Sequence, residues 1–428
     1  MPSVEGPSAS LRTGLPARRA ALQMLDAVLR RGRTLDSAAR GAKGLKSSDQ
    51  ALAVAIVGEV LRRMPDLDVL IDGATRQRLP DDSKARMVLR IALAQKIGLG
   101  TAEHALVATA LPLVDGGPRR LVHGVLGTLL RRGVPPMDAP HLPDPVEQRW
   151  REAWGDDVVA AARRLIANRP PLDLSFADDA EAQEFARQTG GKSLAPRHVR
   201  LNDAGSVSEL PGFGEGRWWV QDLAASLPAR LTPGGTGEVL DLCAAPGGKT
   251  MQMAAAGHRV TAVDRSESRL KRLRENLDRT GLDASSVAAD ALEWQSDRIL
   301  DAILLDAPCS ATGTFRRHPE VLYRARPNII RDSAGLQRRL IARAASWLNT
   351  GGSLVYSVCS LEPDEGEIVV SDFREKTPGF EIAAPRAGEL PEFVTPQGQG
   401  WVRILPGLLE SEGGLDGFFV ARLVRTAT

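Results

Sequence analysis

The feature that most constrains the fold of this chain is a regular alternation of strands and helices that begins near Trp218. Short apolar runs alternate with longer amphipathic stretches, an order that predicts an α/β, Rossmann-like parallel sheet with helices on its faces. The predicted strands are 238–242, 259–263, 299–305 and 353–357, with helices at 250–256, 267–280 and 337–348. Segments 401–405 and 415–423 predict a hairpin-like ending. Such sheets bind ligands outside the carboxyl ends of their strands.

The first third of the chain predicts a separate, all-helical region. Apolar residues recur at helical spacing in 16–31, 49–64, 83–97, 101–113 and 119–132, with breaks at Pro65 and at several glycines. A proline-rich linker, 135–145, follows. Segments 146–168, 172–176 and 179–188 predict a helix, a strand and a helix in a small α+β connector. The domains are therefore expected at 12–135, 136–215 and 216–428.

Charge is distributed unevenly between these parts. Residues 1–135 contain 21 Lys+Arg and 12 Asp+Glu (+9), which leaves 34 and 41 (−7) for the rest of the chain. A basic domain joined to an acidic one favours a polyanion-binding module. Arginines that merely solvate helix faces are the alternative. Arginine pairs such as Arg119-Arg120 and Arg131-Arg132 favour nucleic acid.

Cysteine usage and hydropathy narrow the class of protein. Cys243, Cys309 and Cys359 are the only cysteines, and their separations of 66 and 50 residues fit neither a disulfide framework nor a zinc motif. Residues 1–14 lack the apolar core of a signal peptide, and the apolar stretch 52–61 is too short to cross a bilayer. We therefore expect a cytoplasmic protein with no metal and no membrane partner, and a monomer by default.

A glycine-rich turn follows the first strand of the predicted parallel sheet. Its sequence, 243–250, is Cys-Ala-Ala-Pro-Gly-Gly-Lys-Thr. A phosphate-binding loop would need glycine where Cys243 stands, and the Rossmann Gly-x-Gly-x-x-Gly is absent. Asp264 and Asp290 follow the next strands, where carboxylates can accept ribose hydroxyls and an adenine amino group. Singly, each acid fits a helix cap; together they favour an adenosine without phosphate recognition, namely S-adenosylmethionine.

Two further cysteines also follow predicted strands. Cys309 stands in Asp-Ala-Pro-Cys-Ser and Cys359 in Ser-Val-Cys-Ser. C5 of a pyrimidine is not nucleophilic, but a thiolate that adds to C6 turns C5 into an enamine carbon that can accept a methyl group. Asp306 is available for the ring-nitrogen edge. Free cysteines are often buried small hydrophobes, but the neighbouring prolines and serines favour a chemical role.

These motifs identify a family. The stretch 216–424 resembles the RNA cytosine-5 methyltransferases of the Nop/Sun type, through 241–250, 306–310, 312–313 with 316–319, 356–361 with 365–367, and 416–422. The region 12–133 resembles the NusB-like RNA-binding domain of the bacterial 16S rRNA members, the RsmB/Sun type. The resemblance implies methyl transfer from S-adenosylmethionine to C5 of a cytosine in RNA, with 16S rRNA as substrate and partner.

The resemblance also implies residue roles. Cys359 would be the nucleophile, Cys309 the residue that assists product release, and Asp306 the acid that binds the base. The cofactor would be held by the following residues: Cys243, Ala244, Ala245, Pro246, Gly247, Gly248, Lys249, Asp264, Arg269, Asp290 and Asp306. Arg316, Arg317 and His318 are candidate RNA contacts in a loop, with a merely solvated loop as the alternative. The chain departs from the family pattern at four positions: Val358 for threonine, Gly366 for asparagine, Ala311 for glycine and His123 for asparagine.

Two other functions remain open from the sequence. A DNA cytosine-5 methyltransferase would use the cysteine of a Pro-Cys motif as nucleophile, which would give that role to Cys309. A C5 methyltransferase that acts on another RNA is also open. A NusB-like RNA-binding or ribosome-assembly factor with a vestigial methyltransferase domain is the non-enzymatic alternative. Retention of both cysteines and of the site aspartates favours an active enzyme.

Overall fold

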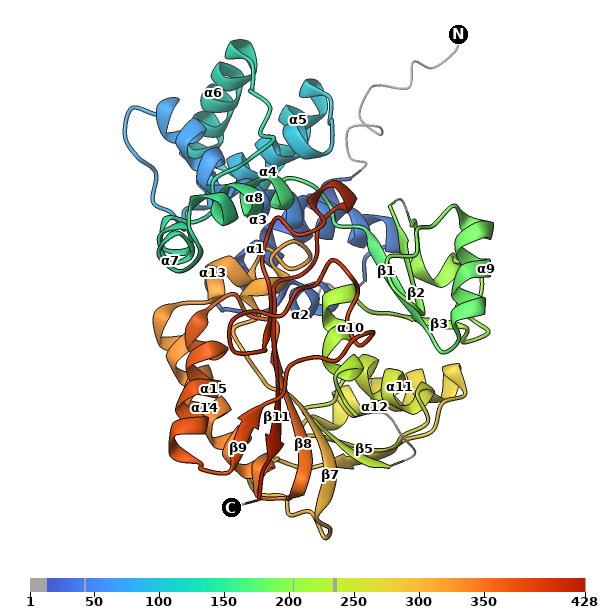
Figure 1. Cartoon of the computed structure of the whole chain (residues 1–428). Helices are drawn as coiled ribbons and strands as arrows, with labels where there is room; N and C mark the ends of the chain where they lie inside the picture. The colour runs from blue at the N-terminus through green and yellow to red at the C-terminus, as the bar shows by residue number, and fades with distance from the viewer. Residues whose placement is uncertain (1–13, 42–43, 203, 234–236, 428) are drawn as a thin grey trace. The chain divides into compact units, whose positions relative to one another are not determined.

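The structure, a computed structural model, describes residues 14–41, 44–202, 204–233 and 237–427 (Figure 1). It consists of two compact units. The helical unit comprises the chain up to Asn168 together with Phe315–Arg324, and the sheet unit comprises the rest. The predicted connector 136–215 is thus divided between the units, and the predicted start at residue 12 lies outside the described residues.

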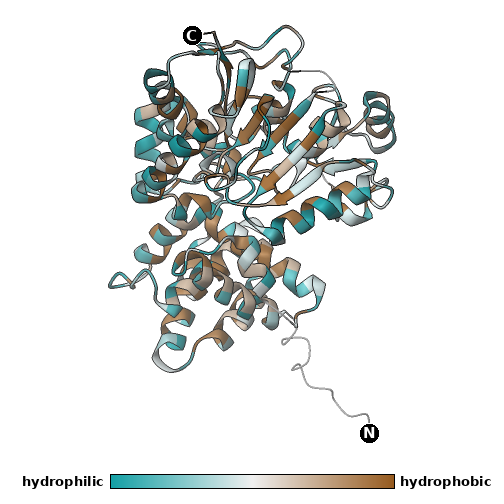
Figure 2. Cartoon of the chain, turned by 90° about the horizontal axis from the view of Figure 1, so that it is seen from below, coloured by the Kyte–Doolittle hydropathy of each residue, from teal (hydrophilic) through white to brown (hydrophobic). Residues whose placement is uncertain are grey.

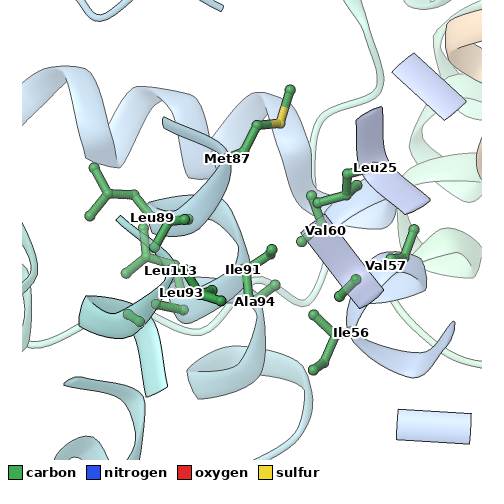
Figure 3. Close-up of a cluster of buried hydrophobic side chains, with 14 of the residues drawn as sticks. Leu25, Ile56, Val57, Val60, Met87, Leu89, Ile91, Leu93, Ala94 and Leu113 are labelled. Atoms are coloured by element: carbon green, nitrogen blue, oxygen red, sulfur yellow. The ribbon is translucent and has the colours of Figure 1, made fainter. Parts of the chain in front are cut away.

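The helical unit is built from eight helices in its described N-terminal part. They are α1 (Leu15–Leu29), α2 (Leu35–Gly41), α3 (Ser47–Gly73), α4 (Lys84–Gly98), α5 (Glu103–Ala110), α6 (Gly116–Arg132), α7 (Asp144–Trp154) and α8 (Asp156–Ile166). Side chains from α1, α3 and α4 form one buried apolar cluster, in which Leu25, Ile56, Val60 and Ile91 lie together (Figure 3). The helical spacing of these apolar residues in the sequence predicted an all-helical region, and this architecture is confirmed.

Two helix boundaries were predicted wrongly. Pro65 lies inside α3 and does not end it. A proline removes the N–H that would bond to the carbonyl four residues earlier, and here the carbonyl of Leu61 accepts a hydrogen bond from the Tyr323 hydroxyl instead, at 2.8 Å. The predicted helix 146–168 is two helices, because Gly155 adopts φ +85° and separates α7 from α8.

The segment Phe315–Arg324 belongs to the helical unit, although it comes from the middle of the α/β sequence. The ring of Phe315 packs edge-on against Trp150, with centroids 5.4 Å apart. Glu320 accepts a hydrogen bond from the N–H of Leu35 at 3.0 Å, and Arg324 donates one to the carbonyl of Gly32 at 2.8 Å. The short helix α13 (Val321–Arg324) ends this segment. The chain therefore passes between the two units three times.

The sheet unit contains a small sheet and a large one. The small antiparallel sheet has the order β2-β1-β3, with β1 (Leu172–Phe176), β2 (His198–Leu201) and β3 (Trp218–Val220), and α9 (Asp179–Thr189) packs on it. The large sheet has the order β10-β11-β8-β7-β4-β5-β6, with β9 also paired to β11. Its parallel strands are β4 (Glu238–Leu242), β5 (Arg259–Asp264), β6 (Ser285–Ala288), β7 (Leu300–Asp306) and β8 (Leu348–Val358).

The antiparallel edge of the large sheet is formed by β9 (Phe380–Ile382), β10 (Val402–Ile404) and β11 (Phe418–Arg425). The hairpin-like ending predicted for 401–405 and 415–423 is therefore confirmed. Helix α14 (Pro327–Ala345) begins ten residues before the predicted helix 337–348, since Pro327 occupies its first turn and its apolar face starts at Ile330. Helix α15 (Glu367–Lys376) was not predicted.

Two apolar layers hold helices on the faces of the large sheet. Successive side chains of β7 point to opposite faces of the sheet. Ile303 and Leu305 pack with α14 and α15 on one face, whereas Leu304 packs with α10 (Leu223–Arg230) on the other. Helices α11 (Gly248–Ala255) and α12 (Glu267–Thr280) contact β5. Figure 2 shows mostly apolar central strands and polar colours on many outer helix surfaces. The predicted Rossmann-like fold is confirmed. Among the described residues, each helix is either too short or too polar to span a bilayer.

Candidate active site

The site lies at the carboxyl ends of the parallel strands. The chain runs from β4 outward through β5 to β6, then returns to place β7 on the other side of β4. Loops that follow β4 and β7 therefore leave the sheet in opposite directions and open a crevice between them, the usual ligand site of such folds. Cys243 follows β4, and Pro308 and Cys309 follow β7.

The glycine-rich turn fits tightly against a helix. Gly247 has φ +104°, and a Cβ on it would lie 2.8 Å from Cγ of Leu273. Only glycine meets both demands. Helix α11 starts at the next residue, Gly248, so its first main-chain N–H groups lie beside the turn. Ala244, Ala245 and Pro246 lie in this turn with Cys243, as the sequence predicts.

A pocket at this crevice combines apolar walls with two carboxylates. It is lined by Cys243, Val263, Asp264, Arg265, Arg269, Ala289, Asp290, Ala291, Pro308, Leu336 and Leu340. Asp264 is buried and is held by the N–H groups of Ser266 at 2.9 Å and Ala245 at 3.2 Å. Asp290 is exposed and accepts from the N–H of Leu292 at 2.9 Å. An apolar slot edged by these acids fits an adenosine.

Arg269 and Cys243 complete the pocket near Asp264. The guanidinium of Arg269 lies 3.4 Å from the Asp264 carboxylate and donates a hydrogen bond to the carbonyl of Ala245. Burial, together with the negative charges of Asp264 and Asp306, raises the pKa of Cys243 to about 12. Cys243 therefore stays a neutral thiol, suited to contact with a ligand rather than to nucleophilic attack.

Asp306 ends β7 and is fixed by two donors. Lys249 reaches from α11 and donates to one carboxylate oxygen at 2.8 Å. The hydroxyl of Ser357, on β8, donates to the other oxygen at 2.8 Å. Lys249 also lies 5.1 Å from the ring centroid of Phe418. The lysine thus faces the acid rather than a phosphate, and it couples the glycine-rich turn to Asp306.

The two remaining cysteines meet at the ends of neighbouring parallel strands. The Sγ atoms of Cys309 and Cys359 are 3.5 Å apart, and both side chains are partly exposed. The hydrogen bond to Cys359, burial and the charge of Glu365 raise the pKa of Cys309 well above its usual value. Cys309 thus retains its proton and can donate it toward Cys359.

Glu365 is the residue whose role sequence reasoning missed. In the sequence it stands only as part of the motif 365–367, yet its buried carboxylate accepts hydrogen bonds from the serines that follow the two cysteines, Ser310 and Ser360. The sequence does contain a signal for this role: an acid lies six residues after Cys359, and a serine follows each of the two cysteines.

The three predicted RNA contacts differ in exposure. Arg316 has 0% exposed surface, so in this structure its side chain is not presented to a phosphate backbone. Arg317 is partly exposed, and the His318 side chain is 42% exposed and lies 3.7 Å from Glu320. Within the described residues, we find no group of three or more His, Cys, Asp or Glu side chains arranged to bind a metal ion.

Comparison with known proteins agrees with this geometry. The model of the 16S rRNA methyltransferase RsmB/F family matches residues 228–424, and that of the NusB family matches 15–131. Ribosomal RNA small subunit methyltransferase B of Xanthomonas campestris pv. campestris is 33% identical over 97% of this chain and 98% of that protein. The protein of the same name from Vibrio cholerae serotype O1 is 31% identical over 95% and 96%.

A solved structure shares the fold. NSun6 from Pyrococcus horikoshii, solved with SFG, is 20% identical, with a TM-score of 0.58 over 68% of this chain and 100% of that one. Fold, crevice and matching family models define the chain as an S-adenosylmethionine-dependent RNA methyltransferase. It belongs to the RsmB/F family of 16S rRNA methyltransferases, with a NusB-type helical region at its N-terminus. The resemblance seen in the sequence is thereby confirmed, and so is the cofactor.

Proposed function

We propose that this chain methylates C5 of a cytosine in 16S rRNA through a covalent adduct between Cys359 and C6. The observation that carries the proposal is the 3.5 Å separation of the Cys309 and Cys359 sulfurs, at the carboxyl ends of adjacent strands. A methyltransferase that acts on a nucleophilic nitrogen or oxygen has no use for two thiols there. Transfer to C5 needs one sulfur to form a bond and a neighbouring group to help break it.

A difference between the two thiols supports these roles. Because the pKa of Cys309 is raised, its S–H is the donor of the pair and can stabilise a thiolate on Cys359. The Cys359 thiolate adds to C6, and the ring's electrons become available at C5. When bound, S-adenosylmethionine supplies the methyl group as an electrophile. In the release step a water molecule takes the C5 proton, the C5–C6 double bond re-forms and the carbon–sulfur bond breaks. The S–H of Cys309, 3.5 Å from the Cys359 sulfur, stabilises the thiolate that leaves.

Asp306 would hold the ring-nitrogen edge of the cytosine. Its carboxylate is oriented by Lys249 and Ser357, both at 2.8 Å. The carboxylate can accept hydrogen bonds from the amino group at C4 and from a protonated N3. The proton on N3 neutralises the negative charge that develops in the ring when sulfur adds to C6. The cofactor would be held by the turn from Cys243 to Lys249 and by Asp264, Arg269 and Asp290. We place the reaction in the cytoplasm, where bacterial ribosomal RNA is made.

RNA would be captured by basic surface. The helical unit exposes Arg119 and Arg120 at the start of α6 and Arg131 and Arg132 at its end. Side chains of this kind bind phosphates without sequence preference. Arg317 and His318 are proposed contacts for RNA phosphates, whereas the Arg316 side chain has no exposed surface with which to make one.

The test is methyl transfer from labelled S-adenosylmethionine to unmodified 16S rRNA, 23S rRNA and tRNA. We expect 5-methylcytosine in 16S rRNA only, loss of transfer in Cys359→Ala, and a trapped protein–RNA adduct in Cys309→Ala. Cys243→Ala serves as the matched thiol variant: it should weaken cofactor binding and trap no adduct. Activity retained in Cys359→Ala but lost in Cys309→Ala would reverse the two roles. No transfer to any RNA, despite cofactor binding, would favour the assembly-factor alternative.

A further inference from the structure

Glu365 lies behind the two reactive cysteines and has no solvent exposure. It ends a short 3-10 turn, Pro363–Glu365, that precedes α15. Burial of a carboxylate is unfavourable unless donors replace the lost water. Its donors come from both cysteine loops.

From the Cys309 loop, Ser310 binds the carboxylate twice. Its main-chain N–H donates to Oε1 at 2.8 Å, and its hydroxyl donates to Oε2. Since Ser310 directly follows Cys309, these two bonds fix the main chain at the position of that thiol.

From the Cys359 loop, Ser360 donates its hydroxyl to Oε2 of the same carboxylate at 2.5 Å. Ser360 in turn accepts from the N–H of Glu362 at 3.1 Å and contacts the Thr312 hydroxyl at 3.2 Å. Ser360 directly follows Cys359. One carboxylate thus bridges the residues next to both thiols.

Surrounding groups hold Glu365 itself in place. The hydroxyl of Tyr356 donates to the main-chain carbonyl of Glu365 at 2.6 Å. Gln337, on α14, donates to Oε1 at 3.4 Å and to the carbonyl of Pro308 at 2.8 Å. The groups that donate to the carboxylate are neutral, and the charge of Glu362 that also acts on it is negative. An ionised Glu365 would therefore place a negative charge near the cysteines.

That charge acts on Cys309. Burial raises the pKa of Glu365, and the hydrogen bonds from Ser310 and Ser360 counteract part of this rise. The hydrogen bond with Cys359 and burial raise the pKa of Cys309, and the negative charge of Glu365 adds to them. The Glu365 carboxylate therefore fixes the geometry of the two cysteine loops and also raises the pKa of the Cys309 thiol.

We propose that Glu365 is a positioning residue that holds the Cys309 and Cys359 loops in register and keeps the proton of the thiol pair on Cys309. This inference rests on the proposed function, since it concerns the same two thiols. Glu365 is fully buried and its oxygens face serines, so it acts through them and not by contact with RNA.

The test compares Glu365→Gln with wild type and with Glu381→Gln, a matched change at an exposed position on β9. Gln has the shape of Glu, but its amide group cannot accept all of these donors and carries no charge. We expect the single-turnover methylation rate to fall about tenfold or more, while cofactor affinity stays within about twofold of wild type. Glu381→Gln should match wild type.

Thiol alkylation provides a readout that needs neither RNA nor activity. Iodoacetamide labelling of each cysteine, followed by mass spectrometry across pH, gives a separate profile for each thiol. In Glu365→Gln the Cys309 profile should move to lower pH by about one unit, because a nearby negative charge is gone. Cys243 serves as the internal control, because burial and the charges of Asp264, Asp306 and Asp241 raise its pKa. Loosened packing alone would raise labelling rates without moving the midpoint.

The outcomes separate this inference from the proposed function. An unchanged Cys309 profile and an unchanged single-turnover rate in Glu365→Gln would overturn the role of Glu365. A shifted profile in a protein that methylates no RNA would support Glu365 and reject the proposed function. If Glu365→Gln does not fold, Ser310→Ala, Ser360→Ala and the double variant decide. If both serines act through one carboxylate, the losses of single-turnover methylation rate in the two single variants should not add in the double variant. Additive losses, or no loss of rate, would overturn the proposal.

Discussion

The Tyr323 hydroxyl donates a 2.8 Å hydrogen bond to the main-chain carbonyl of Leu61, 262 residues earlier in the chain. This carbonyl is the one that Pro65 deprives of its helical partner. Burial raises the pKa of Tyr323 far above its usual value, so the phenol remains a donor. The segment Phe315–Arg324 therefore supplies the hydrogen bond that replaces the one lost at Pro65, and α3 continues through this proline.

Replacing Tyr323 with Phe should destabilise the helical unit. The change removes only the hydroxyl and leaves the Leu61 carbonyl without a donor, at a cost of about 1–3 kcal/mol. Amide hydrogen exchange in α3, and the urea midpoint of the helical unit, would measure the loss. Pro65→Ala restores an N–H to that carbonyl, so Tyr323→Phe should cost less in the Pro65→Ala background. Equal costs in the two backgrounds would show that the phenol and the proline are not coupled.

Gly366→Ala should lower both stability and activity. A Cβ at this position would lie 2.5 Å from Nη2 of Arg403 and 2.9 Å from Cγ of Phe419. Arg403 is buried, pairs with Glu367 and donates to the carbonyl of Ser360 at 2.5 Å, so displacing it disturbs the Cys359 loop. Overpacking of this kind costs about 1–3 kcal/mol.

The control for this substitution is Gly335→Ala in α14, where a new Cβ would meet no atom within 4 Å. Alanine in a helix interior should leave stability equal or raise it by up to about 1 kcal/mol. Thermal unfolding and single-turnover methylation of both variants would be compared. A Gly366→Ala protein as stable and active as wild type would mean that Arg403 can move away without consequence.

Ala311→Gly should stabilise the sheet unit. Ala311 has φ +59°, in the left-handed region that alanine adopts at a cost of about 1–2 kcal/mol. Glycine avoids this cost but loses more entropy on folding, so we expect a net gain of about 0.5–1 kcal/mol. The urea midpoint measures it. Ala387→Gly, at an exposed position without positive φ, should instead be neutral or destabilising. The same sign for both changes would argue against strain at Ala311.

Stability should fall with rising pH because of Asp241. Burial raises the pKa of this acid to about 7, although a 2.6 Å hydrogen bond from Thr250 opposes the rise. The folded state therefore holds a proton that the unfolded state releases near pH 4, and this contribution disappears as pH rises through 7. It amounts to at most about 4 kcal/mol. Asp241→Asn should flatten the dependence of unfolding free energy on pH between 4.5 and 8. An unchanged slope would exclude Asp241 as its source.

Much of the fold followed from local patterns. Short, nearly continuous apolar runs predicted β4, β5 and β7 almost to the residue, since a strand buried on both faces needs such a run. Gly247 marked the turn because its conformation admits no other residue. Pro65 misled the prediction, because whether a proline ends a helix depends on what replaces its missing bond. That replacement, Tyr323, is invisible to any local pattern.

The sequence by itself determined the class of reaction, because the motifs at Cys243, Asp306, Cys309 and Cys359 limit the chemistry whatever the surrounding packing. It also determined the helical and α/β architectures, which depend on residue spacing along the chain. Tertiary structure alone decided that Glu365 bridges the two cysteine loops, that Arg316 is buried and that Phe315–Arg324 joins the helical unit. Each of these relationships is either a contact between residues that are distant in sequence or the burial of a side chain. Both arise only when the chain has folded.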